Sequence, residues 1–265
     1  MLKYKAASAQ TPARFAIPWL VVSAMLGAAP AAAQNGAAFL ETFDSFDTDR
    51  WFISDGWSNG DWMNCTWSSD AVSVENGNLV LSYFEADTPS EGYLCGEIQT
   101  REEFGYGTYE VSMRTMSGSG FNAAFFTYIG PVHDQPHDEI DVEVLLQNTD
   151  EVTFNTYVSG APENGSVASL PQASDDGFIH YAFTWSSDGI RWYVNGTEVH
   201  RTEDGVPRPA NNQKIYASLW GSETFIDWMG PFDPAAVPMD LEVDWIAFTP
   251  IGGDCAFPES VLCQL

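Results

Sequence analysis

Three carboxylates alternate along one short stretch of the sequence, PHDEIDVEVL (136–145). Glu139, Asp141 and Glu143 occupy every second position, and apolar side chains fill the gaps between them. On an extended strand the acids would point to one face and the apolar residues to the other. Like charges packed side by side resist ionising together, and their repulsion costs stability. The pattern therefore indicates that the acidic face has a chemical use.

The outer two acids have a spacing that suits cleavage of a glycosidic bond. On a strand rising ~3.3 Å per residue they lie about 13 Å apart at the backbone, and side chains leaning inward leave roughly 5 to 7 Å between the carboxyls. A retaining glycosidase separates its two carboxyls by ~5 to 5.5 Å, whereas an inverting enzyme needs a wider gap for water. One acid must be ionised and the other protonated, and a third carboxyl, Asp141, could hold their pKa values apart. Spacing alone leaves the two roles of Glu139 and Glu143 open, and a solvated strand face is the plainer alternative.

The segments that would position these acids read as strands. Short alternating or β-branched runs, each ended by Gly, Asn, Asp or Pro, recur along nearly the whole chain, and no stretch has a capped helical period. Asn76-Gly77 and Asn195-Gly196 each predict a tight hairpin turn. We therefore expect an all-β fold, a β-jelly roll sandwich of two packed antiparallel sheets.

Tryptophans fall in loop-like segments beside polar residues. Trp57, Trp62 and Trp67 lie in DGWSNGDWMNCTW, and Trp220 and Trp228 flank GSETFID. A flat ring beside polar groups suits a pyranose, which has an apolar face and a hydroxylated edge. For any single one of the five, a place in the core is the alternative.

The first 33 residues have the features of a secretion signal. Basic residues precede an apolar run (15–26), and Ala31 and Ala33 follow at the small-x-small spacing of a cleavage site. The run is too short for a membrane span, and an uncleaved anchor helix is the alternative. We expect a signal peptide at residues 1–33 and one domain at 34–265.

Charge and cysteine content limit the partners and the compartment. The formal net charge is −27, and it becomes −30 without the first 33 residues, which carry three basic residues and no acidic ones. Such a chain is expected to bind neither nucleic acid nor an anionic membrane. Four cysteines in an exported chain favour two disulfides, and proximity pairs Cys65 with Cys95 and Cys255 with Cys263. A zinc site is disfavoured because no Cys-x-x-Cys pair exists.

Several stretches together resemble the family 16 glycoside hydrolases, in particular bacterial lichenases and endoglycanases that trim succinoglycan-type exopolysaccharide. The resemblance covers nearly all of residues 39–249 and is carried by DGWSNGDWMNCTW, CGEIQTREEFGYGTYEVSMR, AAFFTYIGP, HDEIDVEVL, VTFNTYVSG, YAFTWSSDGIRWYVNG, SLWGSETFIDWMG and VDWIAFT. It implies a jelly roll with a concave substrate cleft and a retaining, endo-acting mechanism. It also implies that Glu139 is the nucleophile and Glu143 the acid/base, with Asp141 between them.

The resemblance extends to further positions, one at a time. It implies sugar contacts at the nonreducing side and near the cleaved bond by Trp57, Asn59, Glu97, Phe126, Tyr128, Asn155, Tyr157, Trp220 and Trp228. Cys65 and Cys95 match the family's disulfide. Thr42, Gly77 and Asp244 match a structural calcium site that is built largely from backbone carbonyls with one carboxylate.

Three cleft positions depart from the lichenase pattern. Gln99 stands where lichenases carry an arginine, His137 where they carry a tryptophan, and Ser218 where they carry an asparagine. All three positions line the cleft, where they bear on the preference of the individual subsites. For His137, a hydrogen-bonded residue at the rim is the alternative to a direct sugar contact.

We expect a secreted, monomeric endo-β-1,3-1,4-glycanase that cuts internal β-1,4 glucosidic bonds of mixed-linkage β-glucan or a succinoglycan-like exopolysaccharide. Its partner is the polysaccharide, catalysis needs no cofactor, and a structural calcium ion is expected. A non-catalytic glucan-binding lectin and a transglycosylase on the same scaffold are the alternatives. A lectin needs the aromatic cleft but not three carboxylates.

Overall fold

The described part of the chain is built almost entirely of β-strands. The computed structural model describes residues 36–87 and 92–265, which belong to one compact unit. The signal peptide expected at residues 1–33 lies outside the described residues. Within these ranges, no helix has the length and apolar character needed to cross a bilayer.

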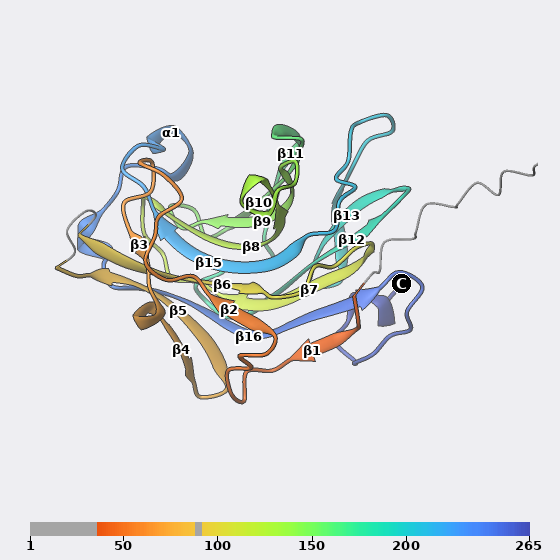
Figure 1. The fold of residues 1–265 in the computed structure, drawn as a ribbon, viewed down its shortest axis with the longest axis horizontal. Helices are drawn as coiled ribbons and strands as arrows, with labels where there is room; N and C mark the ends of the chain where they lie inside the picture. Colours follow the sequence, from red (N-terminus) through yellow and green to blue (C-terminus); the bar gives the residue numbers. More distant parts are fainter. Residues whose placement is uncertain (1–35, 88–91) are drawn as a thin grey trace, which may run out of the picture. The chain divides into compact units, whose positions relative to one another are not determined.

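One layer carries the acidic stretch in its middle. Its strands follow the order β11-β10-β9-β8-β15-β6, with β2 paired to the far side of β6. Their bounds are β11 (Ala161–Ser169), β10 (Glu151–Val158), β9 (Asp138–Leu145), β8 (Phe121–Ile129), β15 (Lys214–Gly221), β6 (Tyr93–Thr100) and β2 (Trp51–Ile53). Figure 1 shows β15 and β8 bowed, with their concave side turned away from the second layer.

The second layer packs behind the first. It runs β6-β5-β16-β7-β12-β13-β14, with β1 on β16, β4 on β5 and β3 on β6. The bounds are β5 (Asn78–Glu85), β16 (Met239–Pro250), β7 (Gly107–Arg114), β12 (Ile179–Ser186), β13 (Gly189–Val194), β14 (Thr197–Arg201), β1 (Phe39–Glu41), β4 (Val72–Glu75) and β3 (Thr66–Trp67). The fold is thus the expected all-β sandwich of the jelly-roll kind.

Strand β6 belongs to both layers. Its first half, Tyr93–Cys95, pairs with β5, and its second half, Gly96–Gln99, pairs with β15. The two predicted sheets are therefore joined into one continuous hydrogen-bonded system. The described pairings are antiparallel except for the short contact of β3 with β6, which is parallel.

The core lies between the two layers. Ile140, Val142 and Val144 of β9 are fully buried, as their alternation with the acids predicts. They join a cluster that includes Val111 of β7 and Phe183 of β12. Burial of this apolar face sets the register of β9, because a slip of one residue would exchange the acids with the core residues.

Both predicted hairpin turns are present. Asn76 and Gly77 join β4 to β5, and Asn195 and Gly196 join β13 to β14, all four with positive φ. This is the backbone of a two-residue turn that follows the twist of the strands. Helical structure in the described residues is limited to α1 (Ile226–Met229) and short 3₁₀ segments at Ser69–Ala71, Pro131–His133, Pro234–Ala236 and Val261–Cys263.

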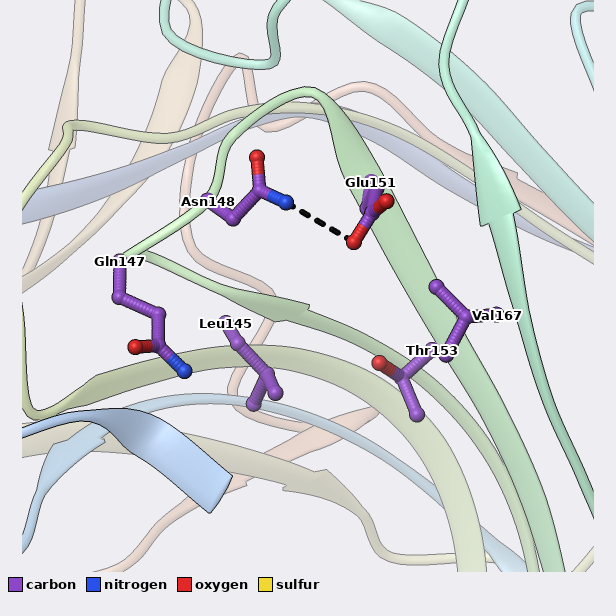
Figure 2. Close-up of a pocket in the computed structure, with 6 residues that line it drawn as sticks. All are labelled: Leu145, Gln147, Asn148, Glu151, Thr153 and Val167. Atoms are coloured by element: carbon purple, nitrogen blue, oxygen red, sulfur yellow. Dashed lines mark hydrogen bonds between the residues drawn. The ribbon is translucent and has the colours of Figure 1, made fainter. Parts of the chain in front are cut away.

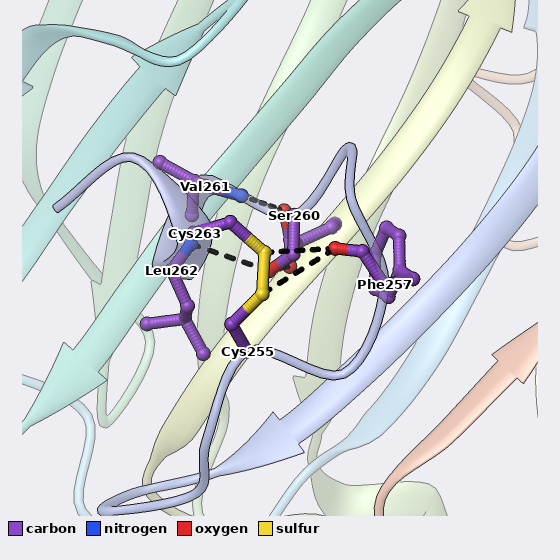
Figure 3. Close-up of a disulfide and its surroundings, with 7 residues drawn as sticks. Cys255, Phe257, Ser260, Val261, Leu262 and Cys263 are labelled. Carbon is purple, nitrogen blue, oxygen red and sulfur yellow. Dashed lines mark hydrogen bonds between the residues drawn. A yellow bond between two sulfur atoms is a disulfide. The ribbon is translucent and has the colours of Figure 1, made fainter.

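Both predicted disulfides are formed, Cys65–Cys95 and Cys255–Cys263. Figure 3 shows the second one closing the loop that contains Ser260. Ser260 Oγ donates to Oε1 of the buried Glu110 at 2.6 Å, and the Val261 N–H donates to its Oε2 at 2.8 Å. Nε2 of His180 lies 2.9 Å from the same Oε2. The C-terminal segment is thereby attached to β7 and β12.

Candidate active site

The three alternating acids stand on the concave face of β9. Their apolar neighbours enter the core, so Glu139, Asp141 and Glu143 point to the other side. Asp141 is buried at 4% exposure, whereas Glu139 and Glu143 are half-buried. The two outer acids therefore remain accessible from the concave side.

Cross-strand pairing brings the predicted cleft residues beside these acids. In β8 and β10, Tyr128 and Tyr157 flank Glu139, Phe126 and Asn155 flank Asp141, and Ala124 and Thr153 flank Glu143. Directly paired residues point to the same face of a sheet. Phe126, Tyr128, Asn155 and Tyr157 thus share the concave face with the carboxylates.

The same face continues across β15 to β6. Tyr216 pairs with Phe126 on one side and with Gln99 on the other, and Ser218 pairs with Glu97. The Tyr216 ring stacks on Phe126 at 4.8 Å, and its hydroxyl donates to Gln99 Oε1 at 3.2 Å. The sequence analysis did not single out Tyr216, which lies in β15 two residues before Ser218 and so points to the same face.

Glu139 is hydrogen-bonded to His137. Nε2 of His137 lies 2.6 Å from Oε2 of Glu139. The His137 ring stacks on Tyr157 at 4.9 Å and meets the edge of Tyr128 at 5.2 Å. Burial raises the pKa of Glu139, and the hydrogen bond and charge of His137 oppose that rise.

Asp141 lies deepest of the three acids. Burial raises its pKa well above the usual range, and the charges of Glu139 and Glu143 raise it further. Trp192 donates from Nε1 to the backbone carbonyl of Asp141 at 3.1 Å, which anchors this part of β9 to the second layer. A protonated Asp141 can donate a hydrogen bond to a neighbouring carboxylate.

Glu143 and Glu97 are two further acids with raised pKa values. Burial raises the pKa of Glu143 to about 7, against a lowering by its hydrogen bond from Asn122 Nδ2 at 2.7 Å. Burial also raises the pKa of Glu97 to about 7, against a lowering by Ser54, whose Oγ donates to Oε1 at 2.6 Å. The sequence analysis missed Asn122 and Ser54, since neither belongs to a recognisable motif.

The five tryptophans noted in the sequence divide between core and cleft. Trp67 is in the core, and its Nε1 donates to Asn59 Oδ1 at 3.0 Å, so that amide oxygen is already engaged. Trp57 is 41% exposed and stacks on Phe52, which pairs with Gln99 on β6. At the other side Trp220 forms one aromatic cluster with Trp62, Trp228 and Phe225, in which Trp220 is only 9% exposed and belongs to the core.

A cavity of about 340 Å³ extends the concave face beyond Glu143. It is lined by Leu145, Gln147, Asn148, Glu151, Thr153 and Val167, which Figure 2 shows around one space. Leu145 follows Glu143 on the same face, and Thr153 is the cross-strand partner of Glu143. Gln147 Nε2 donates to the Trp228 carbonyl at 2.6 Å and so ties this cavity to the aromatic cluster.

The three residues expected at a calcium site converge at a bulge in β16. The bulge falls between Val243 and Trp245, at Asp244. Pairing of Glu41 with Ile246 and of Leu79 with Val243 brings Thr42 and Gly77 to the same part of β16. Within the described ranges, no hydrogen bond or ion pair holds the Asp244 carboxylate, and no cluster of three or more acidic, His or Cys side chains suits a metal. A carboxylate without such a partner is a type of ligand that a hard cation such as calcium prefers.

Comparisons with known proteins agree with this geometry. Residues 59–247 match the family model described as glycosyl hydrolases family 16. The chain is 50% identical over 228 residues to the endo-1,3-1,4-beta-glycanase ExoK of Rhizobium meliloti (strain 1021), covering 86% of this chain and 84% of the relative. A lichenase from a mouse hindgut metagenome superimposes with a TM-score of 0.77 at 36% identity, covering 82% and 100% of the two chains. The beta-glucanase of Bacillus licheniformis gives a TM-score of 0.76 at 34% identity, covering 82% and 99%.

Proposed function

Because this chain belongs to glycosyl hydrolase family 16, we propose that it is a secreted endo-β-1,3-1,4-glycanase that cuts internal β-1,4 glucosidic bonds with retention. Its substrate is a mixed-linkage β-glucan or a succinoglycan-like exopolysaccharide. The endo-1,3-1,4-β-glycanase activity of the ExoK relative and the lichenase activity of the similar structure support the class of substrate. The observation that carries the mechanism is the set of three alternating acids on one concave strand face.

Glu139 acts as the nucleophile. One of its oxygens attacks the anomeric carbon while the glycosidic C–O bond breaks, which forms a glycosyl ester on Glu139. The attack needs the ionised carboxylate. The hydrogen bond from His137 favours that ionised form against the burial that opposes it.

Glu143 acts as the acid and then as the base. It gives its proton to the departing glycosidic oxygen in the first step, and in the second it takes a proton from the water that displaces Glu139 from the sugar. A pKa of about 7 suits a group that must both donate and accept near neutral pH. Two displacements at the same carbon restore the original configuration.

Asp141 holds the outer acids in opposite protonation states. It lies between them and is kept protonated by burial first and then by the charge of whichever outer glutamate is ionised. As a donor it can stabilise the ionised form of Glu139, which separates the nucleophile's pKa from that of Glu143.

The aromatic rings of the concave face, the disulfides and the net charge are compatible with an extracellular polysaccharide substrate. The concave face offers the exposed ring of Trp57 and the half-buried ring of Phe126, which can stack on pyranose faces, whereas Trp220 is only 9% exposed. Two disulfides suit an oxidising compartment, and the net charge of −27 disfavours nucleic acid and anionic membranes. We infer a monomer with a structural calcium ion at Asp244 that takes no part in the chemistry.

Glu139→Gln tests the proposal. The variant keeps the size of the side chain but cannot form the ester, so we expect the release of reducing ends from lichenan, barley β-glucan and succinoglycan to fall by at least about 10⁴-fold. Glu259→Gln, a change at an exposed acid on the C-terminal loop, is the matched control. Native rates for Glu139→Gln would refute the assignment of the nucleophile. Sizing the wild-type products by mass spectrometry separates hydrolysis from transglycosylation, which gives chains longer than the substrate.

A further inference from the structure

His137 occupies a distinctive position beside the nucleophile. It precedes Glu139 by two residues, so both side chains lie on the concave face. Its Nε2 lies 2.6 Å from Oε2 of Glu139, and the two side chains are 31% and 18% exposed. An ionised carboxylate can only accept hydrogen bonds, so Nε2 carries the proton in this contact.

Neighbouring strands hold the His137 ring in place. Tyr157 of β10 stacks on it nearly parallel, at 4.9 Å and 15°, and Tyr128 of β8 meets it edge-on at 5.2 Å. These two tyrosines are also the cross-strand partners of Glu139. The imidazole and the carboxylate are therefore set between the same two rings, and the contact is preorganised.

The backbone around His137 is fixed as well. Gly160 N–H donates to the His137 carbonyl at 2.8 Å. The next residue, the buried Asp138, accepts from Ser159 N–H at 3.0 Å and from Asn211 Nδ2 at 2.8 Å. The entry to β9 is thus tied to the loops after β10 and β14, which limits movement of the imidazole away from Glu139.

We propose that His137 is a positioning residue for the nucleophile, which holds Oε2 of Glu139 and leaves Oε1 aimed at the sugar. This inference rests on the proposed function, because it assumes that Glu139 attacks the anomeric carbon. It differs from the role of sugar contact expected for position 137, because the imidazole acts through Glu139. The conversion of a mobile carboxylate into one with a fixed attacking oxygen lowers the cost of reaching the transition state.

Among the titratable groups around Glu139, His137 is the one that lowers its pKa. The charge of Glu139 raises the pKa of six other groups, which lie on β6, β8, β9, β10 and β15. They are Glu97, Tyr128, Asp141, Glu143, Tyr157 and Tyr216. All of them are acids, so none stabilises a negative charge by its own charge. Of the basic groups nearby, Lys214 lowers the pKa of His133, and Glu103 raises the pKa of both. His137 lowers the pKa of Glu139 both as donor and as charge.

Two variants separate positioning from packing. His137→Phe keeps a flat ring against Tyr157 but has no donor, whereas His137→Gln keeps a donor without the ring. We expect His137→Phe to lower kcat on barley β-glucan by about tenfold or more, with KM changed less than threefold, because one charge-assisted hydrogen bond is lost. The acid limb of its kcat/KM profile should move to higher pH, since the nucleophile loses stabilisation of its ionised form. His137→Gln should recover much of kcat and bring the limb back.

A second measurement follows the nucleophile alone. A 2-deoxy-2-fluoro glycoside with an activated leaving group forms the ester on Glu139 and stops there, and peptide mass spectrometry locates the label. We expect His137→Phe to be labelled more slowly, with the same displaced acid limb. An unmoved acid limb together with an unchanged labelling rate would overturn the proposal, and so would a purely KM effect. Failure of wild type to be labelled at Glu139 would instead refute the proposed function. A thermal melt of each variant confirms that it is folded.

Discussion

Asn122 of β8 donates a hydrogen bond from Nδ2 to Oε1 of Glu143 on β9 at 2.7 Å. Asn122 is fully buried and pairs with Leu145, so it reaches Glu143 diagonally across the two strands. A donor at this place stabilises the ionised form of Glu143 and opposes the burial that raises its pKa to about 7. The working pH of Glu143, the proposed acid/base, is therefore set by two opposed effects.

Replacement of Asn122 by Leu removes the donor at similar volume. The pKa of Glu143 should then rise further, because the lowering influence is lost and burial remains. Since the first step needs the protonated acid, the alkaline limb of kcat/KM should move to higher pH than in wild type. The profile on barley β-glucan measures this, with Asn148→Leu, on the cavity rim, as a control that should leave the limb in place. A limb that moves to lower pH would contradict the role given to Asn122.

Azide rescue distinguishes the two glutamates by stereochemistry. In Glu143→Ala the ester on Glu139 still forms from an aryl glycoside with an activated leaving group, and azide then displaces Glu139 to give the β-glycosyl azide. In Glu139→Ala azide attacks the substrate directly, and the product is the α-glycosyl azide. NMR of the products assigns the anomers. An α product from Glu143→Ala would reverse the two roles.

Asp244 should make thermal stability depend on calcium. An ion bound only by the folded state adds about 2.7 kcal/mol at a concentration 100-fold above its Kd. We expect millimolar calcium to raise Tm of wild type and a chelator to lower it, with activity unaffected well below Tm. Asp244→Ala should abolish the response, whereas Asp254→Ala, at an exposed aspartate, should retain it. Equal calcium responses in both variants would refute the site.

Ser260→Ala should loosen the C-terminal segment. The change removes one of the hydrogen bonds to the buried Glu110 and should lower the free energy of unfolding by about 2 kcal/mol. Urea denaturation measures this, with the exposed Ser187→Ala as the control that changes stability by less than about 0.5 kcal/mol. A loss no larger than that of the control would show that Glu110 does not anchor the segment.

Strand β9 was predictable because burial of its apolar residues and placement of its carboxylates on the concave face require the same alternation. β9 alternates acidic and apolar residues, and the same alternation sets both its register and the facing of its carboxylates. The turns at Asn76-Gly77 and Asn195-Gly196 were predictable because few residues adopt positive φ at two successive positions. The resemblance to family 16 glycoside hydrolases then indicated the candidate site residues that lie far from β9 in the sequence.

Two long strands, β6 and β11, lack a clear alternation of apolar and polar residues for physical reasons. β6 contains Gly96, where an added Cβ would lie 2.4 Å from the Ala71 carbonyl oxygen, so close packing rather than alternation decides its sequence. β11 is an edge strand with Pro162, Asn164 and Gly165, and its register with β10 shifts between Phe154 and Thr156. An edge strand of this kind needs no buried face, and its composition is that of a loop.

The partners of the acids could not be read from their own segment. Asn122 acts on Glu143 from β8, and Ser54 acts on Glu97 from the residue directly after β2; only the three-dimensional register places them there. Asn59 illustrates the reverse case, because a residue expected to contact sugar also holds the core Trp67. The tertiary structure, rather than the local sequence pattern, determines the hydrogen-bond partners of the acids and of Asn59.

Strand β6 couples the unfolding of the concave sheet to that of the sheet behind it. One half of β6 is hydrogen-bonded to β15 and the other half to β5. If either sheet loses its hydrogen bonds to β6, the other sheet therefore loses the support of the same strand. The carboxylate-bearing surface should therefore melt together with the rest of the sandwich in a single cooperative transition, and Cys95, within β6, adds a covalent tie to Cys65 at that junction.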